Sequence, residues 1–157
     1  MPRRDRLLMK YNGVVWKNWQ SKIIEEVSGD ADDRKINWVY DKKGNVGKSF
    51  LAKYLVLKFE AIIASGKASD IFNQIKVWMD GKEDDKDPKL IIVDCPRHQL
   101  DYLNYGAIEQ VKNGMIYSGK YEGGQCLFES PHVFIFANEM PELSKMSRDR
   151  WNIIMAE

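Results

Sequence analysis

The run from Gly44 to Ser49 constrains the fold of this chain more than any other segment. It reads Gly-Asn-Val-Gly-Lys-Ser, follows the apolar residues 36–40, and leads into a helical pattern that starts near Phe50. In a strand–turn–helix unit of this kind, the glycines let backbone N–H groups point inward and the helix start adds partial positive charge. We therefore expect a loop that binds phosphate groups.

Each residue type in this loop suits one part of a nucleoside triphosphate. The turn itself is formed by Gly44, Asn45, Val46 and Gly47. Lys48 would reach the β- and γ-phosphates, and the Ser49 hydroxyl would bind Mg²⁺. The match is incomplete, because the pattern has glycine where this chain has Lys42, and the preceding residue is the acidic Asp41. The alternative is an ordinary glycine turn that happens to precede Lys-Ser.

Length and charge limit the classes of function that the chain can have. Its 157 residues predict one domain with a substantial hydrophobic core. The net charge of +1 excludes nucleic-acid binding through bulk charge, so any such binding needs a local patch. The basic cluster Arg3, Arg4 and Arg6 is one such patch, and a solvated terminal tail is the alternative.

The cysteines and histidines predict neither a disulfide nor a zinc site. Cys95 and Cys126 lie in apolar runs, which indicates reduced core residues. His98 and His132 are far apart and lack a Cys-x-x-Cys companion. The longest apolar stretches are too short to span a membrane, and the start of the chain does not have the pattern of a signal peptide. We therefore expect a soluble protein of the cytosol or nucleus that does not contact membranes.

Helical and strand-like segments alternate along the chain. Helical periodicity predicts helices over 16–27, 48–57, 68–79 and 105–113. Apolar runs predict strands over 36–40, 59–64, 90–94 and 133–137, and residues 115–128 predict a hairpin with Gly123-Gly124 at its turn. The alternation predicts an α/β domain with a central, mostly parallel sheet flanked by helices.

Two further polar residues follow buried strands. Asp94 ends the run 90–94, where a phosphate loop needs a carboxylate to hold Mg²⁺. Asn138 follows the run 133–137 and could orient the water that attacks the γ-phosphate. Each also has a plainer interpretation as the first residue of a turn. Together with the glycine-rich loop, they favour a nucleotide site.

Two segments late in the chain carry basic residues suited to phosphate. Lys120 and Tyr121 lie near the hairpin turn, where a cation and an aromatic ring can hold a sugar-phosphate chain, although an exposed turn is the alternative. Arg148 and Arg150 follow the Asn138 strand. One of them could act as an arginine finger on a neighbouring subunit, or could pair with a surface acid such as Asp149.

In their order and spacing, these residues resemble the superfamily 3 helicase domain of replication-associated proteins (Rep) from circular single-stranded DNA viruses, including circovirus-like ones. The resemblance covers almost the whole chain. The segments that carry it are 15–20, 38–49, 92–97, 112–114, 120–121, 136–139 and 149–151.

The resemblance implies a P-loop NTPase fold of the AAA+ type over residues 31–157, preceded by a helical or oligomerisation segment over residues 1–30. It also implies an ATP-dependent DNA helicase that acts in viral DNA replication in the host nucleus. ATP and Mg²⁺ would lie between subunits of a homo-oligomeric ring, expected to be a hexamer. Single-stranded DNA would pass through the ring, contacted by a β-hairpin.

The resemblance also assigns roles to individual residues. Gly44, Gly47, Lys48 and Ser49 match the Walker A motif. Asp94 matches the Walker B acid, and Asn138 matches the sensor asparagine. Lys120 matches the lysine of the DNA-facing hairpin, and Arg148 or Arg150 lies where the arginine finger is expected.

Two departures from the family pattern matter. The second Walker B acid is replaced by Cys95, so the general base could be Asp94, Glu139 or Glu109. The chain also lacks a His-x-His pair, so we expect no nicking nuclease in it. A nucleotide-dependent DNA-binding or assembly module with little ATP turnover is therefore the main alternative. A small-molecule phosphotransferase is less favoured, because between residues 94 and 138 only Arg97 could cover the phosphates.

Overall fold

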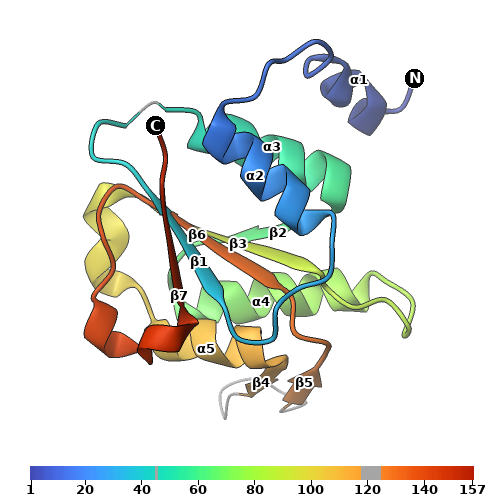
Figure 1. Ribbon diagram of the computed structural model, residues 1–157. Coiled ribbons are helices and arrows are strands. Elements are labelled where there is room, and N and C mark those ends of the chain that lie inside the picture. The colour runs from blue at the N-terminus through green and yellow to red at the C-terminus, as the bar shows by residue number, and fades with distance from the viewer. Residues whose placement is uncertain (45, 118–124) are drawn as a thin grey trace.

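The protein is built around a parallel β-sheet whose strands lie in the order β2–β3–β6–β1–β7 (Figure 1). The computed structural model describes residues 1–44, 46–117 and 125–157. The strands of this sheet are β1 (Ile36–Tyr40), β2 (Ile62–Ala64), β3 (Leu90–Cys95), β6 (His132–Ala137) and β7 (Trp151–Met155). Because neighbouring strands are parallel, all their carboxyl ends meet at one edge of the sheet.

Helices cover both faces of this sheet, as Figure 1 shows. One face carries α2 (Asn18–Val27) and α3 (Lys48–Phe59), and the opposite face carries α4 (Ala68–Asp80) and α5 (Tyr105–Asn113). The remaining elements are α1 (Arg3–Met9), the hairpin strands β4 (Met115–Tyr117) and β5 (Gln125–Leu127), and the 3₁₀ helices η1 (Arg97–Tyr102), η2 (Leu143–Lys145) and η3 (Arg148–Arg150).

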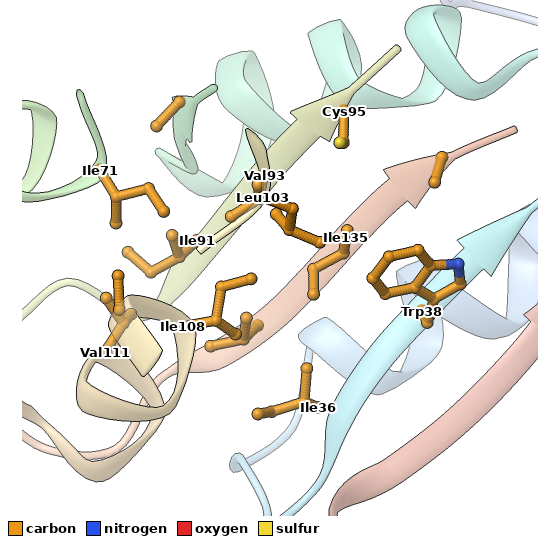
Figure 2. Packing of buried hydrophobic residues seen from close by; sticks show 14 of the residues in the cluster. Ile36, Trp38, Ile71, Ile91, Val93, Cys95, Leu103, Ile108, Val111 and Ile135 are labelled. Atoms are coloured by element: carbon orange, nitrogen blue, oxygen red, sulfur yellow. The ribbon is translucent and has the colours of Figure 1, made fainter. Parts of the chain in front are cut away.

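The central strands are mostly apolar because both of their faces are buried. On β1, Trp38 points to the α4–α5 side, where its ring lies 6.3 Å from Tyr105 and 5.8 Å from Trp151. Its neighbour Val39 points to the other side and packs with Leu51 of α3. Figure 2 shows the cluster on the Trp38 side. A continuous apolar run is the expected sequence of such a strand.

The expected α/β architecture is confirmed, with a central parallel sheet between helices. The antiparallel pairing expected within 115–128 is confirmed by β4 and β5, and the predicted turn at Gly123-Gly124 lies outside the described residues. The expected strand over 59–64 was too long. Phe59 still belongs to α3, Glu60 ends that helix in a left-handed conformation with φ 57°, and the strand begins only at Ile62.

Local patterns did not predict helix α1, strand β7 or the 3₁₀ helices η1, η2 and η3, although α1 lies within the segment 1–30 that the resemblance implies to be helical. The helix α1 has no buried residue, and Arg4 tethers it by donating to the backbone oxygen of Leu57 at 2.6 Å. This contact binds the last turn of α3, where carbonyl groups lack helical partners. The strand β7 pairs along its whole length with β1, which no local pattern reveals. Within the described ranges, no helix is long and apolar enough to cross a membrane.

Candidate phosphate-binding site

The candidate site lies where β1, β6 and β3 end side by side. Tyr40 is aligned with Ala137, and Ala137 is aligned with Cys95, so the residues that follow these strands meet at one level of the sheet. The turn after β1 leads into α3, whose first residue is Lys48. Ligands of parallel α/β sheets bind at this edge.

The glycine-rich turn requires glycine at two positions. Gly44 has φ 78° and Gly47 has φ 106°, both in the left-handed region that side chains disfavour. A Cβ atom on Gly47 would also lie 2.6 Å from Nε2 of Gln20, so the amide of Gln20 would have to move to admit a side chain. Gly47 is the N-cap residue of α3 and has no side chain to accept the first-turn N–H groups. Those donors are therefore suited to an anion.

The start of α2 holds this turn from the outside. Nε2 of Gln20 donates to the backbone oxygen of Gly47 at 3.1 Å, and Nζ of Lys17 donates to the backbone oxygen of Val46 at 2.8 Å. Sequence reasoning did not assign Gln20 a role at the site. Its contact with Lys17 N at 2.9 Å is a local helix-start signal, but its contact with Gly47 spans 27 positions.

The side chains of Lys48, Asn138 and Asp41 meet at this edge. The Asp41 carboxylate forms an ion pair with Nζ of Lys48 and accepts the backbone N–H of Gly44. Nδ2 of Asn138 donates to the same carboxylate at 3.5 Å. The loop lysine and the asparagine after β6, both expected at a nucleotide site, are thus brought together.

Asp94 shares this site with the loop. It is aligned with Phe136, which packs with α3 residues such as Leu51, so Asp94 lies on the α3 side of the sheet. The Asp94 side chain is exposed at the sheet edge, but partial desolvation by its surroundings raises the pKa of its carboxyl above the ordinary value, and the positive charge of Lys48 partly opposes this rise. Lys48 is therefore within electrostatic reach of the Walker B candidate.

Oxygen donors suited to Mg²⁺ are available at this edge. Asp94 offers a carboxylate, and Ser49 offers a hydroxyl from the exposed first turn of α3. Magnesium in nucleotide sites typically takes one or two protein oxygens and fills its other positions with water and phosphate oxygens. The chemistry of this donor pair fits that pattern.

Cys95 lies on the opposite side of the sheet from Asp94. Its side chain is fully buried in the cluster of Figure 2, together with Val93 and Ile135. Burial and the nearby Asp94 charge raise the pKa of the Cys95 thiol to about 11. The thiol is neutral at neutral pH and points away from the loop, so it cannot replace an acid as general base.

Besides Asp94, the candidates for the general base are Glu109 and Glu139, and they lie at different places in the fold. The carboxylate of Glu109 lies 3.4 Å from Nε of Arg150, which precedes β7 and so lies at the end of the sheet away from the loop. Glu139 directly follows Asn138 and is exposed. Of the two, Glu139 is near the candidate site.

The two arginines of η3 have different surroundings. Arg150 is 4% exposed, and its Nη2 donates to Oδ1 of Asn113 at 2.8 Å. Arg148 is exposed. A side chain that reaches a neighbouring molecule must be accessible, so this contrast favours Arg148 as the finger candidate. The predicted roles of Asn45, Lys120 and Tyr121 concern residues outside those that the structure describes.

The chain is similar to known viral replication proteins. It is 38% identical over 142 residues to Para-Rep C3 of Milk vetch dwarf C3 alphasatellite, covering 88% of this chain and 47% of that protein. It is 37% identical over 151 residues to the master replication protein of Milk vetch dwarf virus, covering 94% of this chain and 49% of that protein.

A third relative is the master replication protein of Faba bean necrotic yellows virus, which is 37% identical over 135 residues, covering 85% of this chain and 43% of that protein. The chain thus spans about half the length of the curated relatives it matches. No protein-family model matches it. The similarity confirms the expected resemblance to replication-associated proteins of circular single-stranded DNA viruses.

Proposed function

We propose that this chain, a relative of the replication-associated proteins of circular single-stranded DNA viruses, is a P-loop ATPase of the AAA+ type that serves as the DNA helicase domain of a viral replication initiator. Its relatives are named for replication, and they match it over most of its length. The order of its parallel strands and its glycine-rich loop support an ATPase core within such a protein.

One observation carries the proposal. Lys48 of the loop lies at the same sheet edge as Asn138 after β6, and its charge acts on Asp94 at the end of β3. A nucleotide-hydrolysing site needs a cation for the phosphates, a carboxylate for the metal and a polar group for water at one place. The glycine turn and the N-terminus of α3 add backbone donors beside them.

In this proposal the residues divide the work of phosphoryl transfer to water. Lys48 and the N–H groups of the loop neutralise and position the phosphates, and Asn138 orients the attacking water. Ser49 and Asp94 would hold Mg²⁺, which when bound supplies charge stabilisation at the phosphate oxygens. Glu139 is the carboxylate outside the Walker B strand that we favour as general base.

The proposal extends to assembly and DNA. Arg148 would reach a nucleotide on the neighbouring subunit of a ring, and we expect this ring to be a hexamer. Lys120 and Tyr121 would contact single-stranded DNA from the hairpin whose stem is β4 and β5, and the protein would act in the host nucleus. In Figure 1 the strands β4 and β5 lie on the α5 side of the sheet.

Phosphate release tests the proposal most directly. The unmodified protein should hydrolyse ATP in the presence of Mg²⁺, with stimulation by single-stranded DNA, and Lys48→Ala should abolish turnover. Lys53→Ala is the matched control, because Lys53 is an exposed lysine of the same helix. An ATPase rate that Lys48→Ala leaves unchanged would refute the proposed site.

A second candidate function is a nucleotide-dependent DNA-binding or assembly module with little turnover. The burial of Cys95 on the opposite sheet face favours it, because the position after Asp94 supplies no acid near the loop. Nucleotide binding that depends on Lys48, without phosphate release in the presence of DNA, would select this candidate.

A further inference from the structure

We propose that Asp41 is a built-in competitor of the nucleotide, whose carboxylate binds the same groups that would bind the phosphates. The inference rests on the proposed function, since it concerns the same loop. It assigns a regulatory role to an acidic residue that the nucleotide-binding pattern does not require.

The contacts of Asp41 carry this inference. Its carboxylate forms an ion pair with Nζ of Lys48, accepts the N–H of Gly44 and lies 3.5 Å from Nδ2 of Asn138. These are the groups to which the proposed function assigns the triphosphate and the attacking water. One carboxylate therefore satisfies a cation, a loop N–H group and the sensor amide together.

Burial makes the competition strong. The Asp41 side chain is 4% exposed and that of Lys48 is 14% exposed. Charges are screened little at such positions, so a carboxylate and a phosphate cannot share these donors without a large repulsion. For the same reason, a Lys48 ammonium without an anion beside it would be costly, and Asp41 removes this cost.

The backbone of Asp41 is held in place by the pairing of β1 with β6. Its N–H donates to the backbone oxygen of Ala137 at 3.4 Å, which continues the pairing of β1 with β6 beyond Tyr40. In the inference, the carboxylate leaves the loop by side-chain rotation while this backbone pairing is kept. Nucleotide binding would be coupled to this rotation, so the repulsion and the lost ion pair subtract from the affinity for nucleotide.

Nucleotide titration of variants tests the inference. Asp41→Asn removes the charge and keeps the shape, and Asp41→Ser keeps only a small acceptor for Gly44. We expect both variants to bind ATP about tenfold more tightly than the unmodified protein, with and without Mg²⁺. Isothermal titration calorimetry with ATP measures this. Equal or weaker binding by both variants would overturn the inference, because it would mean that Asp41 is neutral or assists binding.

Asp70→Asn is the matched control. The Asp70 carboxylate accepts the N–H of Ser65 at 2.5 Å just after β2, so it also binds a backbone donor. It lies beyond the edge strand of the sheet, which β3 and β6 separate from β1. Its substitution should leave ATP affinity within about twofold of the unmodified protein. An equal gain in Asp70→Asn would show a general charge effect and contradict competition at the loop.

Two further measurements separate the possible failures. If Lys48→Ala does not weaken ATP binding in the unmodified or the Asp41→Asn background, the proposed function fails and the inference falls with it. If Lys48→Ala weakens binding but Asp41→Asn does not strengthen it, only the inference fails.

Thermal unfolding provides an independent test. The melting temperature of Asp41→Asn should lie below that of the unmodified protein without ATP and above it with saturating ATP. A difference that ATP leaves unchanged would also overturn the inference.

Discussion

The indole Nε1 of Trp38 donates a hydrogen bond of 2.7 Å to the backbone oxygen of Glu139. Trp38 is fully buried in β1, and Glu139 directly follows Asn138. The Tyr105 hydroxyl accepts the N–H of Glu142 at 3.1 Å in the same loop. The core on the α5 side of the sheet thus fixes the backbone that carries the candidate sensor asparagine.

Trp38→Phe should therefore impair turnover more than nucleotide binding. Phenylalanine fills much of the space but cannot donate to Glu139, so Asn138 loses a fixed position. We expect kcat for ATP hydrolysis to fall by about tenfold, with KM within about twofold. The free energy of unfolding should fall by about 1–3 kcal/mol, because volume and a buried hydrogen bond are lost.

Trp151→Phe is the control for that experiment. Its indole packs against Trp38 and donates to the backbone oxygen of Leu143 at 2.9 Å, further from Asn138 along the loop. Its loss should cost comparable stability and less turnover. Equal losses of kcat in both variants would mean that general loosening, not the Glu139 contact, explains the effect.

Gly47→Ala should destabilise the protein and weaken nucleotide binding together. The backbone there has φ 106°, and the new Cβ would meet Nε2 of Gln20 at 2.6 Å. We expect a loss of about 1–3 kcal/mol in the free energy of unfolding, measured by urea denaturation.

The double variant Gly47→Ala, Gln20→Ala separates the two causes. It removes the steric clash and leaves the backbone strain, so it should be less destabilised than the sum of the two single variants. Strict additivity would indicate that the side chain of Gln20 does not limit the space at Gly47.

Much of the fold could be predicted because its signals are local. The strands β1, β3 and β6 are largely apolar runs, and the glycines of the loop carry the positive φ that their sequence context indicates. Asp94 could be placed at the site because parallel strands end at a common edge. The structure brings its charge within reach of Lys48.

What could not be predicted depends on contacts between distant segments. The strand β7 forms by pairing with β1, more than 100 positions earlier in the chain. The hydrogen bond from Gln20 to Gly47 and the ion pair between Asp41 and Lys48 likewise depend on how side chains from distant segments pack. The burial of Arg150 against Asn113 is of the same kind, so the sequence left two arginines as equal candidates.

The contribution of Cys95 to stability should decrease as pH rises from about 9 to about 11. The folded protein holds the Cys95 thiol protonated because burial raises its pKa to about 11, above the ordinary thiol value. In that interval the unfolded chain releases the thiol proton and the folded protein retains it, so rising pH favours unfolding.

Chemical denaturation at several pH values checks this slope. Cys95→Ala should show a shallower fall of the unfolding free energy across the interval, although it is less stable throughout because a buried side chain is lost. Cys126 remains in both proteins and cancels in the comparison. A slope that Cys95→Ala leaves unchanged would show that other groups cause the pH dependence.

Arg150 and Arg148 should differ in what their substitution damages. Arg150 is buried, with Nη2 bonded to Asn113 and Nε 3.4 Å from the Glu109 carboxylate. Arg150→Ala leaves these groups without their partner and opens space, so it should lower the free energy of unfolding by about 1–3 kcal/mol. Arg148→Ala changes an exposed side chain and should stay within about 0.5 kcal/mol of the unmodified protein.

The ATPase assay then separates structure from catalysis. If Arg148 acts on a neighbouring subunit's nucleotide, Arg148→Ala should lose at least about a thousandfold in kcat while it remains folded. Mixing it with Lys48→Ala should restore some activity, because a mixed ring contains interfaces at which an intact loop faces an intact arginine. Full ATPase activity of Arg148→Ala alone would show that Arg148 is not the arginine finger, and another cationic residue would then have to act at the subunit interface.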